Sequence, residues 1–243
     1  MSKRSVALLT AATAGIAACA LVGAPAFADT PGTPTPTPAS SHAPKTLAAI
    51  QTAGAKATSE RETKLSAAIS TVTNDKYLTS ADRSTLLGTL NADLAAMKSS
   101  ASTIASDTTA AQAAADLKAV YTKYRVFAVA LPQARLVSAA DRLSGTTVPK
   151  LTKEQSRLSG LLTGKDNAKS TSALQSALSD MASQISTASH DSDGAASAAL
   201  AVTPSTYDSN HSALSSVKSS LTAARAAAKK AQADAKTIRQ GLK

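Results

Sequence analysis

The sequence predicts an all-α protein, and three features carry this prediction. Apolar residues recur at alternating spacings of three and four, the pattern of helices that pack on neighbouring helices as in a coiled coil. Aromatic residues make up only 2% of the chain, and there is no Trp, whereas β-sandwiches and barrels need aromatic and β-branched strands. Many of the apolar positions hold Ala or Leu, which favour helices. We therefore expect long helices packed closely through small residues.

Residues 1–28 have the pattern of an export signal peptide. Lys3 and Arg4 form a basic start, residues 6–22 are almost all apolar or small, and residues 26–28 read Ala-Phe-Ala, a small-x-small cleavage site. We expect cleavage after residue 28. The mature protein is then expected to be secreted, either free or associated with the cell wall. Loss of the two cations lowers the net charge from +10 to +8, and a basic exported protein tends to meet anionic surfaces.

Cys19, the one cysteine of the chain, lies within this signal. A mature chain that begins at Asp29 would have no disulfide, and helix packing alone would stabilise it. The alternative is a lipoprotein signal, in which residues 16–19 are recognised and Cys19 carries lipid. The apolar run continues beyond Cys19, which favours the first interpretation. No later stretch is apolar enough to cross a bilayer, so we expect no transmembrane helix in the mature chain.

Residues 29–44 are expected to form an extended linker, because prolines alternate there with Thr and Gly. The first helix is expected over residues 45–73, with a turn at residues 74–79. Thr79 and Asp82 then supply a hydroxyl cap and a first-turn carboxylate for the second helix.

The third helix is expected to begin after Asp107. If it is continuous from Thr109 to Leu162, its length is about 80 Å at ~1.5 Å per residue. Pro132 is expected to kink this helix rather than end it, because the apolar seam resumes at once. At residues 145–149 the sequence is consistent with either a break or a bend of this helix.

A fourth helix is expected from about Leu174 to residue 203, with an interruption at residues 190–194. The last helix is the most regular, since it keeps its seam from Leu214 to Leu242. These lengths predict an elongated antiparallel helical bundle, in which two three-helix bundles share one long kinked helix. The bundles would comprise residues 45–131 and 132–243. A compact bundle of four or five helices is the alternative.

The sequence contains no pattern typical of catalysis. His42, His190 and His211 lack the i, i+4 pairing that places two imidazoles on one metal. There is no glycine-rich phosphate loop, no G-x-S-x-G elbow and no carboxylate pair in an apolar setting. We therefore expect a protein that is not an enzyme, with no cofactor and no metal site.

The last helix supplies the first candidate binding site. Residues 208–243 have a net charge of +5, from seven Lys or Arg and two Asp. The small apolar seam must face the core, so the cations are expected to form a solvated stripe. This stripe predicts salt-sensitive binding to an anionic cell-wall polymer, with a plain solvent face as the alternative. Its residues are Lys229, Lys230, Lys236 and Arg239.

The second candidate is the segment 119–143, which has the highest density of Val and Leu after residue 28. Its aromatic residues Tyr121, Tyr124 and Phe127 fall on one face of a continuous helix. They are expected in the core, and the alternative is an apolar groove near Pro132 that carries a small ligand. The core positions that we predict are Leu94, Met97, Tyr124, Phe127, Leu131, Leu221 and Ile238.

Several segments resemble a group of exported all-helical proteins of unknown function from actinobacteria, the high-GC Gram-positive bacteria. These segments are YRVF at 124–127, followed by PQ-x-R-L-V and AADRL, with LTSADRSTLLGTL before them and TPSTY after them. The resemblance implies an exported helical protein and transfers no active site. Together with the residues it predicts a non-catalytic module associated with the cell envelope, with the small-ligand carrier as the alternative. We expect no specific nucleic-acid partner, and the oligomeric state stays open.

Overall fold

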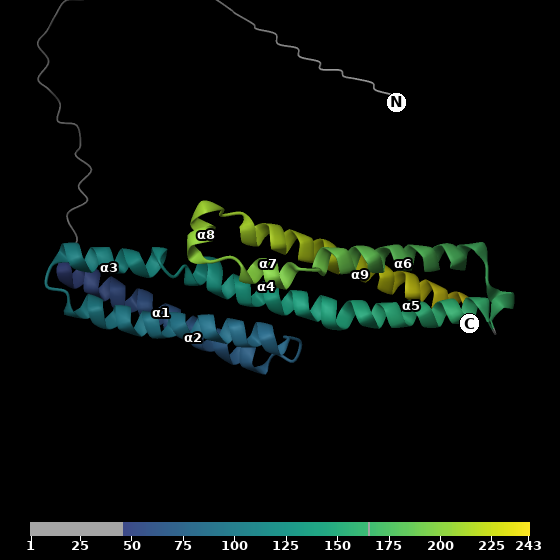
Figure 1. Cartoon of the computed structure of the whole chain (residues 1–243), viewed down its shortest axis with the longest axis horizontal. Helices are drawn as coiled ribbons and strands as arrows, with labels where there is room; N and C mark the ends of the chain where they lie inside the picture. Colours follow the sequence, from purple (N-terminus) through teal and green to yellow (C-terminus); the bar gives the residue numbers. More distant parts are fainter. Residues whose placement is uncertain (1–45, 165) are drawn as a thin grey trace, which may run out of the picture. The chain divides into compact units, whose positions relative to one another are not determined.

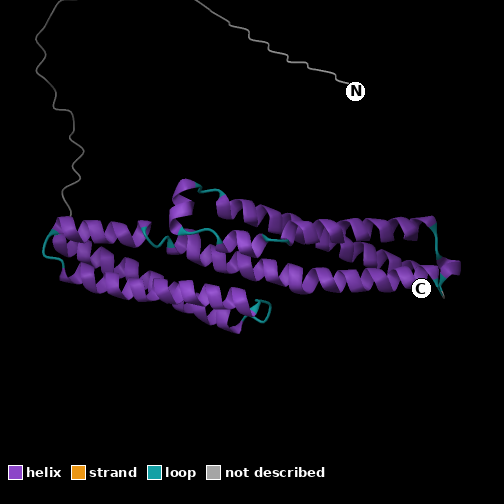
Figure 2. Ribbon diagram, in the orientation of Figure 1, coloured by secondary structure: helices purple, strands orange, loops and turns teal. Residues whose placement is uncertain are grey.

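The computed structural model describes residues 46–164 and 166–243, which form helices joined by short turns, with no strand among them (Figure 2). The all-α prediction is confirmed. The expected signal at residues 1–28 with its Cys19 and the expected linker at residues 29–44 lie outside the described residues. In the part that is described, no helix is both long enough and apolar enough to cross a membrane.

The helices follow one another along the chain as coloured in Figure 1. The α-helices are α1 (Leu47–Asn74), α2 (Ser80–Ser106), α3 (Ala110–Thr122), α4 (Leu131–Arg142), α5 (Val148–Thr163), α6 (Ser172–Ser192), α7 (Ala195–Leu200), α8 (Pro204–Ser209) and α9 (Ala213–Gly241). Two π-helical turns, η1 (Val126–Ala130) and η2 (Leu143–Thr147), and one 3₁₀ turn, η3 (Asn167–Lys169), join some of them.

Threonine caps begin the first three helices. The side chains of Thr46, Thr79 and Thr109 each accept a hydrogen bond from the backbone N–H three residues further on. Such caps satisfy N–H groups that have no partner inside the helix. The predicted start of the second helix at Thr79 is therefore confirmed.

The central helix is interrupted at a place that the sequence did not indicate. α3 ends at Thr122, and Arg125 adopts the left-handed conformation with φ 46°. A left-handed residue cannot continue a right-handed helix. The expectation of one helix from 109 to 162, bent at Pro132, was therefore wrong in the position of its interruption. Arg125 is held from another part of the chain, because its guanidinium pairs with the Asp208 carboxylate at 2.7 Å.

Both prolines of this region lie inside helix, each two residues after a π-helical turn. At these turns Leu131 N–H donates to the Val126 carbonyl, and Val148 N–H donates to the Leu143 carbonyl. A proline has no N–H, and its ring collides with the carbonyl four residues back in a regular α-helix. The wider π turn already departs from that hydrogen-bond ladder. Helix therefore continues from Val126 to Thr163 through Pro132 and Pro149.

Two clusters of buried apolar side chains hold these helices together. The first joins α1–α4, α7 and the first part of α9, and the second joins α5, α6 and the rest of α9. α1, α2 and α3 pack against one another, as do α5, α6 and α9 (Figure 1). The boundary expected between residues 131 and 132 runs through the first cluster, which contains Val129 and Val137.

The predicted core residues divide into three groups. Met97, Leu221 and Ile238 are buried, as predicted. Leu94, Leu131 and Tyr124 are half-buried and pack against the first cluster. Phe127 is 45% exposed, so its placement in the core was wrong. The cause is the interruption at Arg125, which removes Phe127 from the helical face that the continuous pattern assumed.

Candidate functional site

The basic face of α9 is oriented by the packing of its opposite face. Ala224, Ala228, Ala231 and Ala235 are all buried, and α9 packs along α6 and against α5. Alanine at these positions lets the helices approach closely, which leaves no room for a long side chain on this face. The Lys and Arg residues of α9 are consequently exposed.

The exposed cations form a line that differs from the predicted stripe. Arg225, Lys229 and Lys236 are separated by four and then seven residues, so they lie on one face of the helix. Lys230 lies about 100° around the helix from Lys229 and is not part of this line. Arg225, which the sequence analysis did not select, therefore belongs with Lys229 and Lys236.

Arg239, the fourth predicted stripe residue, is partly neutralised. Its guanidinium lies 3.8 Å from the Glu154 carboxylate of α5, which also pairs with Arg157 at 2.8 Å. The hydrogen bond from Arg157 lowers the pKa of Glu154 below the usual carboxyl value, so this carboxylate stays charged. Arg239 thus offers less uncompensated charge than Lys229 or Lys236.

A hollow of about 360 Å³ lies where α4 and η2 meet α9. Three cationic side chains line it, with one hydroxyl, one amide and small apolar side chains. We call it the basic groove, and its residues are Ala139, Arg142, Leu143, Thr147, Arg225, Ala228, Lys229 and Gln232. Its lining contains no carboxylate.

The cations of the basic groove have no acidic partner within the described ranges. The ion pairs found there involve other Lys, Arg or His side chains, and none of them includes Arg142, Arg225 or Lys229. Arg142 instead lies over the ring of Tyr77, 4.8 Å from its centroid. A cation–π contact of this kind orients a guanidinium without cancelling its charge. The groove therefore has three uncompensated positive charges.

The carboxylate nearest to Arg142 in sequence is turned away from the groove. Asp141 is buried, and it accepts a hydrogen bond of 2.9 Å from the backbone N–H of Thr79. Burial is the main cause of the raised pKa of Asp141, which the Thr79 N–H partly offsets. Asp141 therefore fixes the end of α4 against the start of α2, while Arg142 remains exposed beside α9.

The three predicted aromatic residues do not line one groove. Tyr121 and Phe127 are 48% and 45% exposed, and their rings both contact the buried Arg61, whose guanidinium carbon lies 4.3 Å and 5.0 Å from the ring centroids. Tyr124 instead lines a hollow of about 110 Å³ together with Asp93 and other residues. The interruption at residues 123–125 separates the rings.

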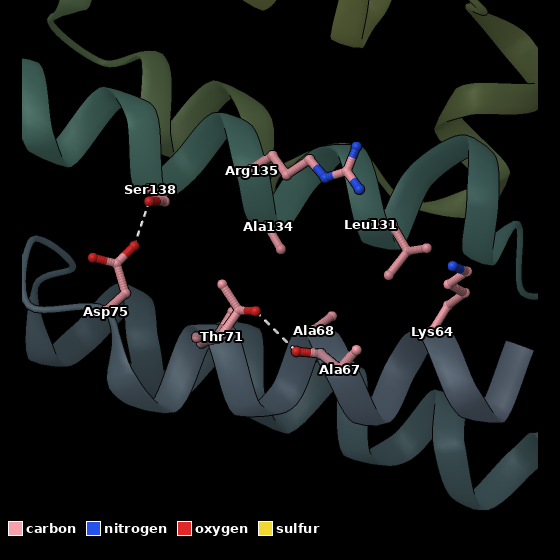
Figure 3. A pocket seen from close by; sticks show the side chains of 10 residues that line it. Lys64, Ala67, Ala68, Thr71, Asp75, Leu131, Ala134, Arg135 and Ser138 are labelled. Atoms are coloured by element: carbon pink, nitrogen blue, oxygen red, sulfur yellow. Dashed lines mark hydrogen bonds between the residues drawn. The ribbon is translucent and has the colours of Figure 1, made fainter.

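A second large hollow, of about 380 Å³, lies between α1 and α4 (Figure 3). Lys64 and Arg135 line it together with the carboxylate of Asp75, which accepts a hydrogen bond from the Ser138 hydroxyl. Its charges are therefore of both signs, and its carboxylate already has a partner. This hollow lies beside Leu131, close to Pro132, but none of the predicted aromatic rings lines it.

Comparisons of the chain with protein-family models, with curated proteins and with solved structures found no match. Within residues 46–164 and 166–243, no group of three or more His, Asp or Glu side chains is placed to hold a metal ion. The geometry of the helices is therefore the basis for a function. The sequence analysis selected Lys229 but not Arg142, Thr147 or Arg225. The proximity of Arg142 and Thr147 to α9 depends on the packing of α4 and η2.

Proposed function

We propose that the protein is an exported, non-catalytic module that binds an anionic cell-envelope polymer through α9 and the basic groove. The observation that carries this proposal is the convergence of cations from two distant segments. Arg142 and Arg225 are more than eighty residues apart in sequence, yet both line one hollow with Lys229 and without a carboxylate.

The line of cations along α9 suits a repeating negative charge. Lys218, Arg225, Lys229 and Lys236 are exposed and recur at steps of four and seven residues, which correspond to about 6 and 10 Å along a helix. An extended polyanion can contact several of these charges at once. Exposed charges of this kind are screened over ~10 Å at 0.1 M salt, so the binding should weaken as salt is added.

The geometry favours this proposal over the small-ligand carrier. The hollow beside Tyr124 is about 110 Å³, whereas ligand pockets usually measure ~300–1,000 Å³. The hollow near Pro132 has that size, about 380 Å³, but charged side chains of both signs line it and no aromatic ring does. Tyr121 and Phe127 are about half exposed and contact Arg61. Phe127 lines a hollow of about 360 Å³, but its other lining residues are polar or charged and include neither tyrosine. The apolar groove that the carrier requires therefore lacks its three rings.

Retention of the secreted protein on purified cell walls tests the proposal. We expect retention at low salt that is lost at high salt. Replacing Arg142, Arg225 and Lys229 by Gln should weaken it about tenfold, because three exposed contacts of about 0.5 kcal/mol each are lost.

The matched control removes the same charge from other exposed positions. Lys56, Lys98 and Lys118 are exposed on α1, α2 and α3, and their replacement by Gln should change retention less than twofold, that is by under about 0.4 kcal/mol. Equal losses of retention in the two triple variants would show that net charge alone, rather than the basic groove, causes the binding. Absence of retention of the unmodified protein at low salt would overturn the proposal.

A further inference from the structure

We propose that the basic groove is a seat for one phosphate group of a polyol-phosphate or sugar-phosphate polymer. This inference rests on the polymer-binding function proposed above, and it names the chemistry of the polymer. A line of lysines alone would bind the carboxylates of an acidic polysaccharide or polypeptide as well as phosphates. The proposed seat is instead expected to prefer phosphate.

The cations of the groove match the oxygens of a phosphate. Arg142 and Arg225 present planar guanidinium groups, which can donate two parallel hydrogen bonds to phosphate oxygens, and Lys229 adds a point charge. They come from two helices, so they can approach an anion from different sides. The non-bridging oxygens of a phosphodiester surround a tetrahedral phosphorus and can accept from several directions, whereas a carboxylate accepts best near the plane of its own group.

The rest of the lining suits the hydroxylated unit next to the phosphate. The groove, at about 360 Å³, has room for more than one phosphate group. The Thr147 hydroxyl donates to the Arg142 carbonyl at 3.2 Å, so its oxygen is left to accept. The Gln232 amide can both donate and accept. These two side chains can hydrogen-bond a polyol or sugar hydroxyl.

Local contacts hold the seat in place before any ligand binds. Arg142 is oriented by the Tyr77 ring, and its neighbour Asp141 is fixed to the Thr79 backbone. Small residues, Ala139 and Ala228, leave the space between the helices open. The hollow therefore depends on shape as well as on charge, and a variant that fills it without changing charge can test the inference.

The experiment compares the affinities of the full secreted chain for poly(glycerol phosphate) and poly-glutamate of equal charge at one salt concentration. We expect the phosphate polymer to bind about tenfold more tightly, because bidentate phosphate contacts are stronger than simple charge contacts. Ala139→Leu, which fills the groove, should abolish this preference. Ala92→Leu, at an exposed position of α2, is the matched control and should keep it.

A second variant keeps the test decisive if Ala139→Leu alters the fold. Arg225→Lys retains the charge at an exposed position but removes the guanidinium fork, and it should lower the phosphate preference about fivefold. Lys218→Gln with Lys236→Gln should instead weaken the binding of both polymers alike.

The outcomes separate the two proposals. Equal, salt-sensitive binding of both polymers by the unmodified chain, or an unchanged preference in Arg225→Lys, would overturn the phosphate seat and leave the polymer-binding function standing. No binding of either polymer would overturn both. Tighter binding of anionic lipid vesicles or of an oligonucleotide with the same number of phosphates would overturn the assignment to a polyol-phosphate or sugar-phosphate polymer.

Discussion

The two hydrophobic clusters are built in different ways. The second, between α5, α6 and α9, consists of Leu, Ile, Met, Val and Ala side chains. The first contains the same residue types, but the helices that form it also bury the amide or charged side chains of Arg61, Gln133 and Asp141. In α6 of the second cluster the buried polar side chain is the Ser192 hydroxyl, which donates to the Ala188 carbonyl of its own helix. Regular helices meet in the second cluster, whereas the first includes the break at Arg125 and the short helix α7.

Two of these buried polar groups, Gln133 and Asp141, contact the ends of other helices, whereas Arg61 lies within α1. The Gln133 amide donates to the carbonyls of Ala199 and Val202, at 2.9 Å and 3.1 Å, at the end of α7. Asp141 accepts from the Thr79 N–H at the start of α2. Helix ends leave backbone groups unpaired, and buried groups of this kind need partners. An apolar seam therefore suffices between long helices, whereas interrupted helices need specific polar contacts.

The largest effect is expected from a cavity in the second cluster. Leu158 is fully buried, and Leu158→Ala should lower the free energy of unfolding by ~2–5 kcal/mol through lost burial and an unfilled cavity. Thermal unfolding followed by circular dichroism measures this. Because α9 contributes to both clusters, we expect one transition in this variant, and two separated transitions would show that the clusters are independent.

The next effect tests the polar contacts of the first cluster. Gln133→Leu replaces the amide by an apolar side chain of similar size and so removes the donor for the carbonyls at the end of α7, and it should cost about 2–3 kcal/mol. Urea unfolding gives the value. Gln240→Leu, at an exposed position, is the control and should change the free energy of unfolding by less than about 0.5 kcal/mol. A neutral Gln133→Leu would mean that apolar packing alone specifies this cluster.

A smaller effect is expected from Asp93, which lines the hollow beside Tyr124 and Gln133. Burial raises the pKa of Asp93 from 3.8 to about 6. The folded state therefore holds this proton more tightly than the unfolded state, so the contribution to stability is present below about pH 4 and is lost as the pH rises towards 6. Asp93→Asn should stabilise the protein at pH 7 by about 1–2 kcal/mol, below the ~3 kcal/mol ceiling that the two pKa values set.

Unfolding curves of the Asp93→Asn variant and the unmodified chain between pH 4 and pH 7 provide the measurement. The stability difference between the two proteins should grow as the pH rises through this range. A difference that stays constant with pH would show that the Asp93 carboxyl titrates alike in the folded and unfolded states.

The smallest effect is expected at Phe127. Its ring is 45% exposed and contacts Arg61, so Phe127→Ala should cost about 1 kcal/mol or less, the usual range of an exposed cation–π contact. A fully buried Phe would cost ~3–5 kcal/mol. Thermal unfolding of Phe127→Ala and Leu158→Ala under the same conditions compares the two losses of unfolding free energy. Equal losses would show that the Phe127 ring is buried in the core.

The sequence predicted the regular helices well, and α9 best of all. Its seam from Leu214 to Ile238 is buried as the spacing indicated, and the start of α2 after Thr79 was also predicted. Both depend on local features, namely side-chain period and cap chemistry. The break at Arg125 was missed because an arginine gives no local signal for a left-handed conformation, and its partner Asp208 is distant in sequence.

Local patterns were enough to predict that the chain is helical, which face of α9 is buried and that Lys229 and Lys236 are exposed, because helical period and side-chain polarity act over a few residues. The fold was needed to show that Arg142 and Thr147 join Arg225 and Lys229 around one hollow, and that Tyr121 and Phe127 lie outside the core. These placements depend on how α4 packs on α9 and on the break before η1. Contacts between distant segments fix both features, and no local pattern in the sequence encodes them.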